Sequence, residues 1–599
     1  MKQIIIGTGS CGIAAGGLQV KETFLRLAQE SGTAFSIQET GCMGMCYCEP
    51  MVEVRDESGT RTIYGNVDAS LATLIFQQHV QGGAPIADAV LLTCDGGGLE
   101  AGFLGPQVRL VLSRCGAIDP ESIDDAIGMD AYVGLRKALD MSPGAVVDAV
   151  LSSGLKGRGG AGFPTGLKWK FAAGYDADQK YIICNADEGD PGAFMDRSIL
   201  EGDPHSVIEG LIIGGFAIGA TKGYLYVRAE YPIAIRRLQI ALEQAEARGF
   251  LGQNILGSGF DFHLTIKEGA GAFVCGEETA LIESIEGNRG MPRIRPPFPA
   301  ERGLFGKPTN INNVETLANI GFILRNGWEA FAAYGTEESN GTKVFALAGK
   351  VRRGGLVEIP IGMTIRDVVD GIGGGTSSGK PLKAVQMGGP SGGCIPANMV
   401  DTVIDYKSLA ETGAIMGSGG MIVMDADNCM VDIARYFLQF TQSESCGKCT
   451  FCKIGTKRML DILERITQGE GVEGDVEKLE HLSHQIKSNA LCGLGQTAPN
   501  PVLTTIRYFR NEYDDHIREG KCTTCQCKAL IHYEISAETC IGCTLCARKC
   551  PVDAISGQVK TLHTINQDTC TKCGICKNIC KFDAVVVNSG GAAHAKHCN

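Results

Sequence analysis

Two runs of cysteines near the C-terminus constrain the fold of this chain more than any other feature. In each run, three cysteines are separated by two residues each, and a fourth follows after three more. This spacing is typical of two 4Fe–4S clusters, because the fourth thiolate of each run can reach across to the other cluster. The first cluster is expected to bind Cys540, Cys543, Cys546 and Cys580. The second is expected to bind Cys570, Cys573, Cys576 and Cys550. Two matched four-cysteine runs argue against zinc knuckles, which use close pairs of ligands.

A further cysteine motif lies in a region with a helical pattern. Cys446, Cys449 and Cys452 have the spacing that surrounds one face of a 4Fe–4S cluster, and Cys492 is the candidate fourth ligand. A zinc site inside a helix bundle is the alternative. The hydrophobic periodicity of residues 431–520 predicts such a bundle. Its expected helices are Met430–Gln442, Lys457–Thr467, Val476–Ser488 and Pro501–Ile517.

The N-terminal cysteines predict a smaller cluster. Strand-like and helix-like segments alternate in residues 1–80, which predicts a small α/β module. Two of its loops carry cysteines that can meet around a 2Fe–2S cluster. The expected ligands are Cys11, Cys42, Cys46 and, as the fourth, Cys48. The alternative is a module of the same fold that has lost its cluster.

Cysteines that follow the helix bundle predict another metal site. In residues 521–535, Cys522 and Cys527 lie close enough to His516 in sequence to share a structural zinc ion, with Cys525 or a distant residue as the fourth ligand. Free thiols in a hinge, or another iron–sulfur cluster, are the alternatives. The remaining cysteines are isolated, and most of them are expected to be small buried hydrophobes. These are Cys94, Cys115, Cys184, Cys275, Cys394, Cys429 and Cys598.

Glycine-rich and polar loops in residues 131–340 predict a nucleotide-binding domain of alternating strands and helices. The loop at 154–169 has six glycines, whose backbone N–H groups can surround a phosphate, and Lys168 adds positive charge. Three more loops carry the acidic and amide side chains that can bind a flavin ring edge or a ribose. They are residues 185–192, 268–279 and 307–316. One such loop is typical of an ordinary turn or helix cap, but four in one domain favour a bound nucleotide.

Composition and charge exclude several classes of function. The 26 cysteines occur without a recognisable targeting segment, which favours metal ligation over disulfides. A net charge of −12 disfavours nucleic-acid binding. The longest apolar stretch, around Val207–Ala220, falls short of the roughly 20 residues that cross a bilayer. We therefore expect a cytoplasmic protein without a membrane span. Residues 81–130 are predicted to be a linker, and residues 341–430 a small β-rich module.

Five of these segments resemble the flavin-bearing, NADH-oxidising subunit of respiratory complex I and its soluble relatives. They are residues 157–169, 185–192, 273–281, 307–316 and 445–452. The resemblance covers about residues 131–520. The order of parts in the whole chain is most similar to the NAD-reactive β subunit of soluble electron-bifurcating hydrogenases. This implies a multidomain α/β and α+β fold with a thioredoxin-like N-terminal module and a Rossmann-like FMN and NADH domain. An SLBB-like β-grasp module, a helical 4Fe–4S domain and a two-cluster ferredoxin-like domain at residues 536–599 should follow.

The resemblance also implies the residues of the cofactor site. FMN is expected to contact Gly157, Gly159, Lys168, Asn185, Asp187, Glu188, Tyr226, Glu277, Asn312 and Asn313. The nicotinamide cofactor is expected to contact Phe163, Phe171, Phe273, Glu277, Glu278 and Phe298. Arg158 and Gly160 of the glycine loop complete the expected pocket, and Glu188 and Asp190 are the expected catalytic residues.

The chain departs from the family pattern at three positions. Arg295 stands where a lysine is frequent beside the adenosine, and Asp190 stands where complex I has a glutamate near the nicotinamide carboxamide. Both departures leave the choice between NAD and NADP open. Ile6 stands where the first cysteine of the usual N-terminal pair would be, which leaves the 2Fe–2S ligand set open.

The implied function is that of an oxidoreductase subunit. It exchanges hydride with NAD(P)(H) at FMN and single electrons with ferredoxin and a partner catalytic subunit, by flavin-based electron bifurcation. The alternatives are a non-bifurcating NADH dehydrogenase (diaphorase) subunit of a hydrogenase or formate dehydrogenase, and a flavin-free relay scaffold.

The resemblance implies both cofactors and partners. The expected cofactors are FMN, NAD(H) or NADP(H) as substrate, three 4Fe–4S clusters, one 2Fe–2S cluster and one structural zinc ion. The expected partners are ferredoxin and the other subunits of a redox complex. These are a thioredoxin-like 2Fe–2S subunit and a hydrogenase, formate dehydrogenase or transhydrogenase subunit.

Overall fold

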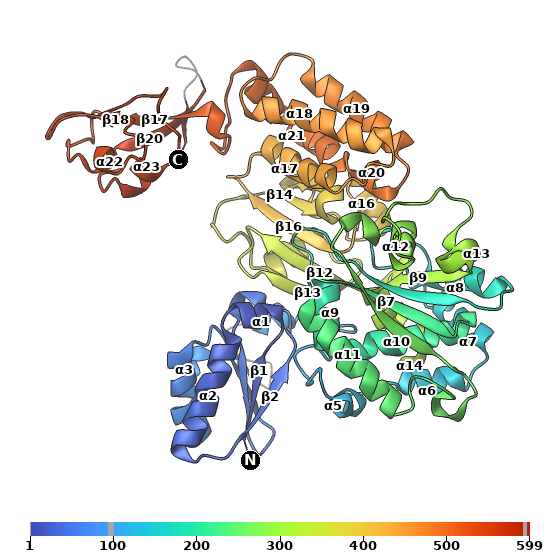
Figure 1. The fold of residues 1–599 in the computed structure, drawn as a ribbon. Coiled ribbons are helices and arrows are strands. Elements are labelled where there is room, and N and C mark those ends of the chain that lie inside the picture. Colours follow the sequence, from blue (N-terminus) through green and yellow to red (C-terminus); the bar gives the residue numbers. More distant parts are fainter. Residues whose placement is uncertain (1, 94–100, 591–595, 599) are drawn as a thin grey trace. The chain divides into compact units, whose positions relative to one another are not determined.

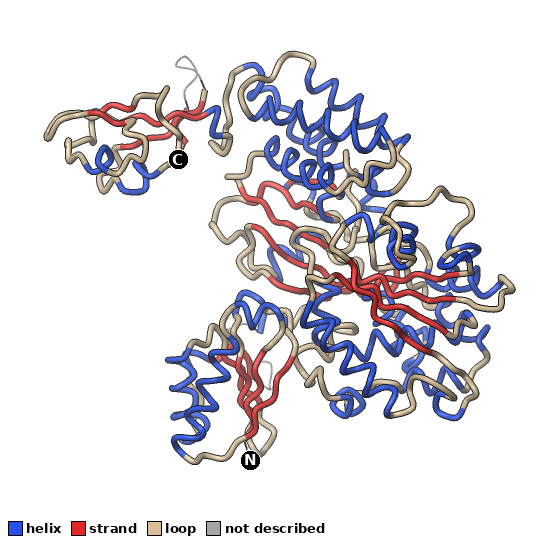
Figure 2. Tube along the Cα trace, viewed as in Figure 1, coloured by secondary structure: helices blue, strands red, loops and turns tan. Residues whose placement is uncertain are grey.

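The computed structural model describes residues 2–93, 101–590 and 596–598. The chain divides into two compact units, the first with residues 1–379 and 384–423 and the second with residues 380–383 and 424–599. Figure 1 colours both units along the sequence, and Figure 2 separates their helices from their strands. In the part of the chain that the structure describes, no helix has the length and apolar character needed to cross a bilayer.

The N-terminal module of the first unit is a five-stranded mixed sheet. Its strand order is β2 (Ser36–Thr40), β1 (Gln3–Gly7), β3 (Val52–Arg55), β4 (Arg61–Tyr64) and β5 (Val90–Thr93). Helices α2 (Gly17–Ser31) and α3 (Ala69–Leu74) lie on the same side of this sheet (Figure 2). Alternate residues of β1 are buried in the same core as Phe24 of α2, as the period of two in a strand requires.

This sheet extends beyond residue 80, the predicted end of the module. β5 pairs with β4 up to Thr93, so residues 90–93 belong to the sheet and not to the predicted linker. The strand has only four residues, and an apolar run this short carries too little periodicity to be recognised. Later in the predicted linker, α5 (Ile123–Gly128) packs against α11 (Pro232–Ala247) of the next domain.

The central domain of the first unit contains a four-stranded parallel sheet. Its order is β8 (His263–Gly269), β7 (Lys222–Arg228), β6 (Tyr181–Ala186) and β9 (Thr309–Asn313). Residues 182–184 of β6 are fully buried, which fits a strand covered on both faces. The alternation of strands and helices confirms the predicted α/β domain.

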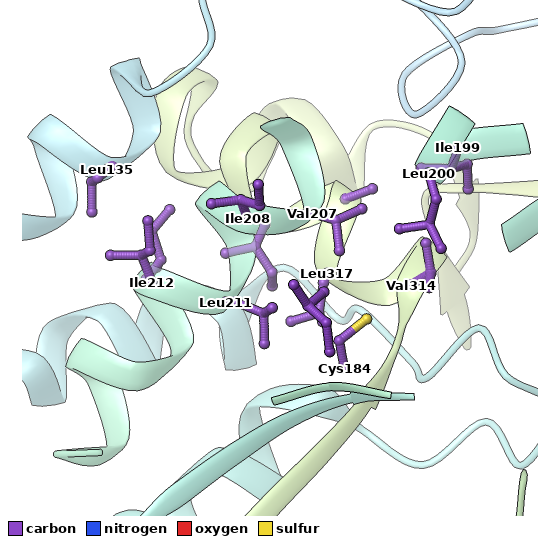
Figure 3. Packing of buried hydrophobic residues seen from close by; sticks show 14 of the residues in the cluster. Leu135, Cys184, Ile199, Leu200, Val207, Ile208, Leu211, Ile212, Val314 and Leu317 are labelled. Atoms are coloured by element: carbon purple, nitrogen blue, oxygen red, sulfur yellow. The ribbon is translucent and has the colours of Figure 1, made fainter. Parts of the chain in front are cut away.

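Helix α10 (Pro204–Ile218) forms the centre of this domain. It begins at Pro204, after Asp203 caps its first turn by accepting a hydrogen bond from the Ser206 N–H. Nearly every side chain of α10 is buried, because helices surround it on several sides. Figure 3 shows Val207, Ile208, Leu211 and Ile212 of α10 beside Val314 and Leu317 of α14 (Val314–Asn326), with Cys184 of β6 below them. Each such buried aliphatic side chain stabilises the fold by about 1.5–3 kcal/mol.

A second sheet is formed mostly by residues of the first unit. Its order is β13 (Gly355–Pro360), β12 (Thr342–Gly349), β16 (Gly420–Asp425), β14 (Leu382–Met387) and β15 (Gly393–Pro396). β12 pairs in parallel with β16 and antiparallel with β13. This mixed sheet is the predicted small β-rich module.

The second unit begins with the predicted helix bundle. The four expected helices are present as α17 (Met430–Ser443), α18 (Thr456–Thr467), α19 (Asp475–Asn489) and α21 (Asn500–Arg518). Their apolar faces share one core that includes Leu438, Leu463, Leu479 and Ile506. The boundaries agree within a few residues because each helix has a clear amphipathic period.

The C-terminal domain is small and has little regular structure. β17 (Ile531–Ile535) pairs with β20 (Val585–Ser589), and short helices α22 (Leu545–Arg548) and α23 (Ile575–Ile579) lie between them in sequence. The domain therefore begins at Ile531, a few residues before its predicted start at 536.

Candidate functional site

The carboxyl ends of the parallel strands bring together polar side chains from distant parts of the sequence. Asn185 of β6 lies between Tyr226 of β7 and Asn313 of β9, which are its register partners. In parallel sheets these ends meet at one edge, where α/β domains bind ligands. The Asn185 amide donates a hydrogen bond of 2.9 Å to the Gly276 carbonyl, which ties the edge to the loop after β8. The structure thus places these predicted cofactor residues side by side.

The glycine-rich loop between α7 (Pro143–Ser152) and α8 (Thr165–Gly174) lies against this edge. A Cβ atom at Gly159 would lie 2.9 Å from the Cβ atom of Asn313, so a larger residue does not fit there without a shift. Gly160 has a φ of 119°, which favours glycine. Bare backbone therefore approaches the strand ends closely, as a site for a flat cofactor with a phosphate requires. The residues present fit FMN.

The side chain of Arg158 differs from its prediction as a cofactor ligand. Arg158 is fully buried, and its guanidinium group donates to the carbonyls of Lys156 at 3.1 Å and Asn340 at 2.6 Å. Its own N–H donates to Thr316 Oγ1 at 2.8 Å. Arg158 therefore holds the glycine loop in place from inside the protein.

The asparagines of β9 are oriented by neighbouring donors. The indole of Trp169 donates to Asn312 Oδ1 at 2.8 Å, and the Asn310 amide donates to the same oxygen at 2.6 Å. The Asn312 amide N–H₂ group is thereby directed away from these donors. Asn313 donates to Asp196 at 2.6 Å and caps α14 through Thr316.

The predicted acidic and basic residues form two pairs near the glycine loop. Lys168 pairs with Glu278 and also donates to the Ile311 carbonyl at 2.6 Å. Arg295 lies 3.8 Å from Glu277 and 4.0 Å from Glu278. Glu277 itself caps α12 (Glu278–Ile285), since its Oε2 atom accepts from Thr279 and Ala280. The positive charges thus lie beside the loop that would hold an anionic cofactor.

The two predicted catalytic residues are held by different partners. The Glu188 carboxylate is buried and accepts the N–H groups of Asp196 and Arg197, both at 3.1 Å, so it caps the start of α9 (Met195–Gly202). Burial raises its pKa. Asp190 accepts a hydrogen bond of 2.7 Å from Ser418, and burial raises its pKa to about 6.

Three of the aromatic rings predicted to contact the nicotinamide cofactor are strongly exposed. Phe163, Phe171 and Phe298 are 47%, 50% and 57% exposed, which is unusual for residues this apolar. Phe273 begins the short helix Phe273–Gly276, and a Cβ atom at Gly189 would lie 2.6 Å from its ring. Flat exposed rings of this kind can stack on a base or a nicotinamide.

The four cysteines predicted as ligands in the helix bundle influence one another through their charges. Burial raises the pKa of Cys452 to about 11, and the charges of Cys449, Cys492 and Cys446 add to this effect. The four side chains therefore share one electrostatic environment at the start of α18 and α20 (Gly493–Thr497). Ser445 Oγ lies 3.1 Å from Cys452 Sγ. This donor set fits a 4Fe–4S cluster.

The C-terminal cysteines sit in two copies of one backbone pattern, about 30 residues apart. The Ala554 N–H donates to Cys550 Sγ at 3.2 Å, and the Ala584 N–H donates to Cys580 Sγ at 3.3 Å. Asp553 and Asp583, one residue earlier, both have positive φ. Backbone N–H groups directed at sulfur are favourable for thiolates that bind a cluster.

A group of four buried ligands lies in the second unit. The side chains of Cys429, His516, Cys522 and Cys527 have ligand atoms within 4.8 Å of one another. His516 Nε2 lies 3.4 Å from Cys429 Sγ and 3.3 Å from Cys527 Sγ, and Nδ1 faces the Glu512 carbonyl at 2.7 Å. A carbonyl on the second ring nitrogen is the usual support of a histidine that binds zinc.

This group corrects one prediction about isolated cysteines. Cys429 is predicted to be an isolated hydrophobe, yet it is the distant fourth member, and Cys525 lies outside the group. The remaining isolated cysteines that the structure describes, Cys115, Cys184, Cys275 and Cys394, are buried as predicted. Cys94 and the side chain of Cys598 lie outside the described residues.

The N-terminal module brings three of its four predicted ligands together. Cys11, Cys42 and Cys46 have sulfur atoms within 4.8 Å of one another, with Cys42 Sγ and Cys46 Sγ 3.7 Å apart. Cys48, the predicted fourth ligand, does not join this group. The pKa of Cys11 is lowered to about 3 by hydrogen bonds from Cys42 and Cys46, with a further contribution from Arg197. Such a thiolate fits a metal or cluster ligand.

The carboxyl edge of the parallel sheet, with Asn185, Tyr226 and Asn313, is called the flavin edge below. Helix α9 connects this edge with the N-terminal module inside the first unit. Its first turn is capped by Glu188, and Glu201 in its last turn accepts hydrogen bonds from the Ser10 N–H at 2.8 Å and the Ser10 hydroxyl at 2.6 Å. Arg237 donates to the Glu201 carbonyl at 2.6 Å and to Thr8 Oγ1 at 3.1 Å. Sequence reasoning did not find these contacts, because no local pattern marks them.

Family models match the same regions of the chain. Residues 150–321 match the Nuo51 FMN-binding domain, and residues 432–516 match the iron–sulfur binding region of NADH-ubiquinone oxidoreductase-F. Residues 344–395 match the SLBB domain, and residues 533–587 match a 4Fe–4S dicluster domain. The fold and the site therefore define an NAD(P)H-dependent oxidoreductase subunit with an FMN-binding domain and 4Fe–4S regions.

Similarity over most of the chain places it in a particular family. The NADP-reducing hydrogenase subunit HndC of Solidesulfovibrio fructosivorans is 58% identical over 457 residues, which cover 76% of this chain and 93% of HndC. An NADH-quinone oxidoreductase subunit of Rhizobium meliloti is 47% identical over 392 residues, which cover 65% of this chain and 93% of that protein. The chain belongs to the family of these flavin subunits.

A solved structure supports the same conclusion. The NAD+-reducing NiFe hydrogenase in its H2-reduced state matches with a TM-score of 0.62 and 31% identity, covering 86% of this chain and 84% of that chain. The predicted resemblance, fold class and enzyme class are confirmed.

Proposed function

We propose that this chain is the flavin subunit of a multi-subunit redox complex, in which it exchanges hydride with NAD(H) or NADP(H) and passes single electrons onward. One observation carries the proposal: Asn185, Tyr226 and Asn313 lie side by side at the carboxyl edge of the sheet, and the bare backbone of a glycine loop packs closely on this edge. The 58% identity to a hydrogenase subunit supports the assignment to such a complex.

The residues of the pocket bind and orient rather than exchange protons. Bound FMN supplies the chemistry that links two-electron hydride exchange with single-electron transfer. We assign ring and ribose contacts to the amides of Asn185, Asn312 and Asn313, whose orientations are set by their hydrogen bonds. Lys168 and the loop backbone balance the phosphate charge. The exposed rings of Phe163 and Phe298 are proposed to cover the dinucleotide.

We propose five metal centres for the chain. Three are 4Fe–4S clusters, one in the helix bundle and two in the C-terminal domain, and one is a 2Fe–2S cluster in the N-terminal module. The fifth is a zinc ion at Cys429, His516, Cys522 and Cys527, whose four buried ligands leave no open position and therefore suit a structural site.

The flavin assignment is tested with the anaerobically purified full chain. The wild type is expected to carry bound FMN and to oxidise NADH with viologen as acceptor. Asn185→Ala should weaken FMN binding about tenfold, because about 1.4 kcal/mol of hydrogen bonding is lost. Asn326→Ala changes an exposed asparagine at the end of α14 and is the matched control. Absence of both FMN and viologen activity in the wild type would remove the proposal and favour a flavin-free relay.

Electron bifurcation is the finer part of the proposal. Cluster sites occur both before and after the flavin domain in sequence, so electrons have more than one exit, as bifurcation requires. The test is whether ferredoxin reduction by the purified complex depends on a second acceptor being reduced at the same time. Equal rates with either acceptor alone would instead favour a non-bifurcating diaphorase subunit.

Partners and location complete the proposal. We expect ferredoxin, a thioredoxin-like 2Fe–2S subunit and a hydrogenase, formate dehydrogenase or transhydrogenase subunit to purify with the chain from the cytoplasmic fraction. Arg295 lies beside Glu277 and Glu278, and this arrangement does not decide between NAD(H) and NADP(H) as the substrate. Comparing the rates of oxidation of NADH and NADPH by the purified chain decides between them.

A further inference from the structure

The N-terminal cysteine group lacks a fourth thiolate. Cys11, Cys42 and Cys46 supply three sulfur donors, whereas protein-bound 2Fe–2S clusters take four protein ligands. Ile6, at the position where relatives would place a further cysteine, is an apolar residue that is fully buried. The backbone carbonyl of Cys48 accepts from Asn66 at 2.6 Å, and its Cβ atom lies against Gly65.

Glu49 is the buried carboxylate beside this group. It is 8% exposed. Hydrogen bonds with Cys11 and Cys46 and burial raise the pKa of the Cys42 thiol, and the charge of Glu49 adds to this effect. A Cβ atom at Gly12, the residue after Cys11, would lie 3.2 Å from Glu49 Oε2. A Cβ atom at Gly7 would lie 3.1 Å from the same oxygen and 3.4 Å from Oε1. Glycines at both positions therefore give the carboxylate access to the turn that carries Cys11.

The Glu49 carboxylate differs in its partners from a buried carboxylate nearby in the same module. Glu49 forms no ion pair within the described part of the chain, and the Met51 N–H donates a hydrogen bond of 3.0 Å to its Oε2 atom. Glu53, two strand positions after Met51 and equally buried, is paired with Arg55 at 2.9 Å and Arg61 at 2.8 Å. A carboxylate that is ionised and buried without a cation costs several kcal/mol, a cost that protonation or a bound metal ion relieves.

Other polar side chains around the group are already engaged. The Ser10 hydroxyl donates to Glu201 at 2.6 Å, and Thr8 Oγ1 accepts from Arg237 at 3.1 Å. Arg197, which lies beside Cys11, is a cation and cannot bind iron. Glu201, the other carboxylate that reaches this turn, is engaged by the N–H and the hydroxyl of Ser10. Among the described residues, Glu49 is therefore the more available anionic oxygen donor, since its Oε2 atom accepts a backbone hydrogen bond from Met51.

We propose that Glu49 is the fourth ligand of the N-terminal 2Fe–2S cluster, which is bound by three thiolates and one carboxylate oxygen. The ionised carboxylate donates an oxygen lone pair to the iron that the three cysteines leave incompletely ligated. Carboxylate oxygen is a suitable ligand for ferric iron, and three thiolates with one carboxylate carry the same total charge as four thiolates. The inference rests on the proposed 2Fe–2S cluster.

The test compares five variants of the full chain with the wild type by electron paramagnetic resonance and 57Fe Mössbauer spectroscopy. In the wild type, one ferric site of the 2Fe–2S cluster should show the larger isomer shift of oxygen ligation. Glu49→Cys should make the two sites alike and change the g values. Glu49→Gln should lower cluster occupancy at least about tenfold. Cys48→Ser and Glu53→Gln should leave the spectra unchanged.

The controls separate this inference from loss of fold and from the flavin assignment. Glu49→Asp keeps the carboxylate, and retention of FMN in each variant shows that the first unit is folded. Unchanged spectra in Glu49→Cys and Glu49→Gln, or loss of the signal in Cys48→Ser, would overturn the inference alone. A wild type without any 2Fe–2S signal would overturn the cluster as well, whereas FMN content and viologen activity report separately on the flavin site.

Discussion

The C-terminal cluster domain and the N-terminal cysteine group assemble their ligands in different ways. The C-terminal domain repeats one backbone pattern, so that Cys550 with Ala554 matches Cys580 with Ala584. The N-terminal group joins Cys11 with thiols from a loop about 30 residues later, and a glutamate stands beside them. Ligands within a repeat are specified by local spacing, whereas ligands from separate loops depend on tertiary packing.

The largest expected effect tests the sharing of ligands within the repeat. Cys550→Ser should remove the cluster of the Cys570 run and leave the other, because the fourth thiolate crosses between the runs. Iron analysis should show a loss of about four iron atoms per chain. Cys394→Ser is the control, since a hydroxyl can still donate to Gln386. Loss of the Cys540-run cluster with retention of the other would contradict shared ligation.

A second prediction extends the comparison to the buried four-ligand group, which also draws on distant segments. Cys429→Ser and His516→Ala should each lower zinc affinity by at least about 10–100-fold, because one of four ligands is lost. Cys525→Ser should retain the metal. Zinc analysis after dialysis against a chelator measures this. If Cys525→Ser loses zinc while Cys429→Ser keeps it, the structural grouping is wrong.

A third prediction concerns the flavin edge, where the site depends on close backbone packing and not on the spacing of metal ligands in the sequence. Gly159→Ala places a Cβ atom 2.9 Å from Asn313 Cβ, and we expect a cost of about 2 kcal/mol, or about 30-fold in FMN affinity. Titration of the FMN-depleted chain by flavin fluorescence measures the change. Gly144→Ala, at a helical position where nothing lies within 4 Å, should have no such effect. Equal losses in both variants would indicate a general folding defect.

The smallest expected effect is a pH dependence at Asp190. Its folded pKa of about 6 lies above the ordinary value of 3.8, so ionisation costs the folded state free energy as the pH rises through 6. After allowance for its partial exposure, Asp190→Asn should stabilise the first unit by about 1 kcal/mol at pH 7.5, and the gain should shrink toward pH 5. Thermal unfolding at both pH values measures it.

The exposed Asp176 provides the control for this measurement. Asp176→Asn should leave the unfolding temperature unchanged at both pH values. A gain in Asp190→Asn that is equal at pH 5 and pH 7.5 would show that the carboxyl group does not titrate in this range.

The sequence could predict the elements whose signals are local. The four helices of residues 431–520 have strong amphipathic periods and agree with α17, α18, α19 and α21. The resemblance led to Asn185, Tyr226 and Asn313, which the structure brings to one edge. Cys429 was missed as a member of the buried four-ligand group, because it lies far in sequence from His516, Cys522 and Cys527. The side chain of Arg158 was expected in the cofactor pocket, but it is buried and donates to backbone carbonyls. The sequence of a glycine loop does not show whether a basic side chain in it faces a phosphate or the protein interior.

Helix α9 makes the N-terminal module an integral part of the first unit. Glu188 at the flavin edge accepts hydrogen bonds from the first turn of the helix, and Glu201 in the last turn accepts one from the Ser10 N–H. A shortened chain without residues 2–93 would leave the Glu201 carboxylate without Ser10 and the Arg237 guanidinium without Thr8. Such a chain would therefore expose two polar groups that the N-terminal module satisfies, and we expect the last turn of α9 to be less firmly held in it.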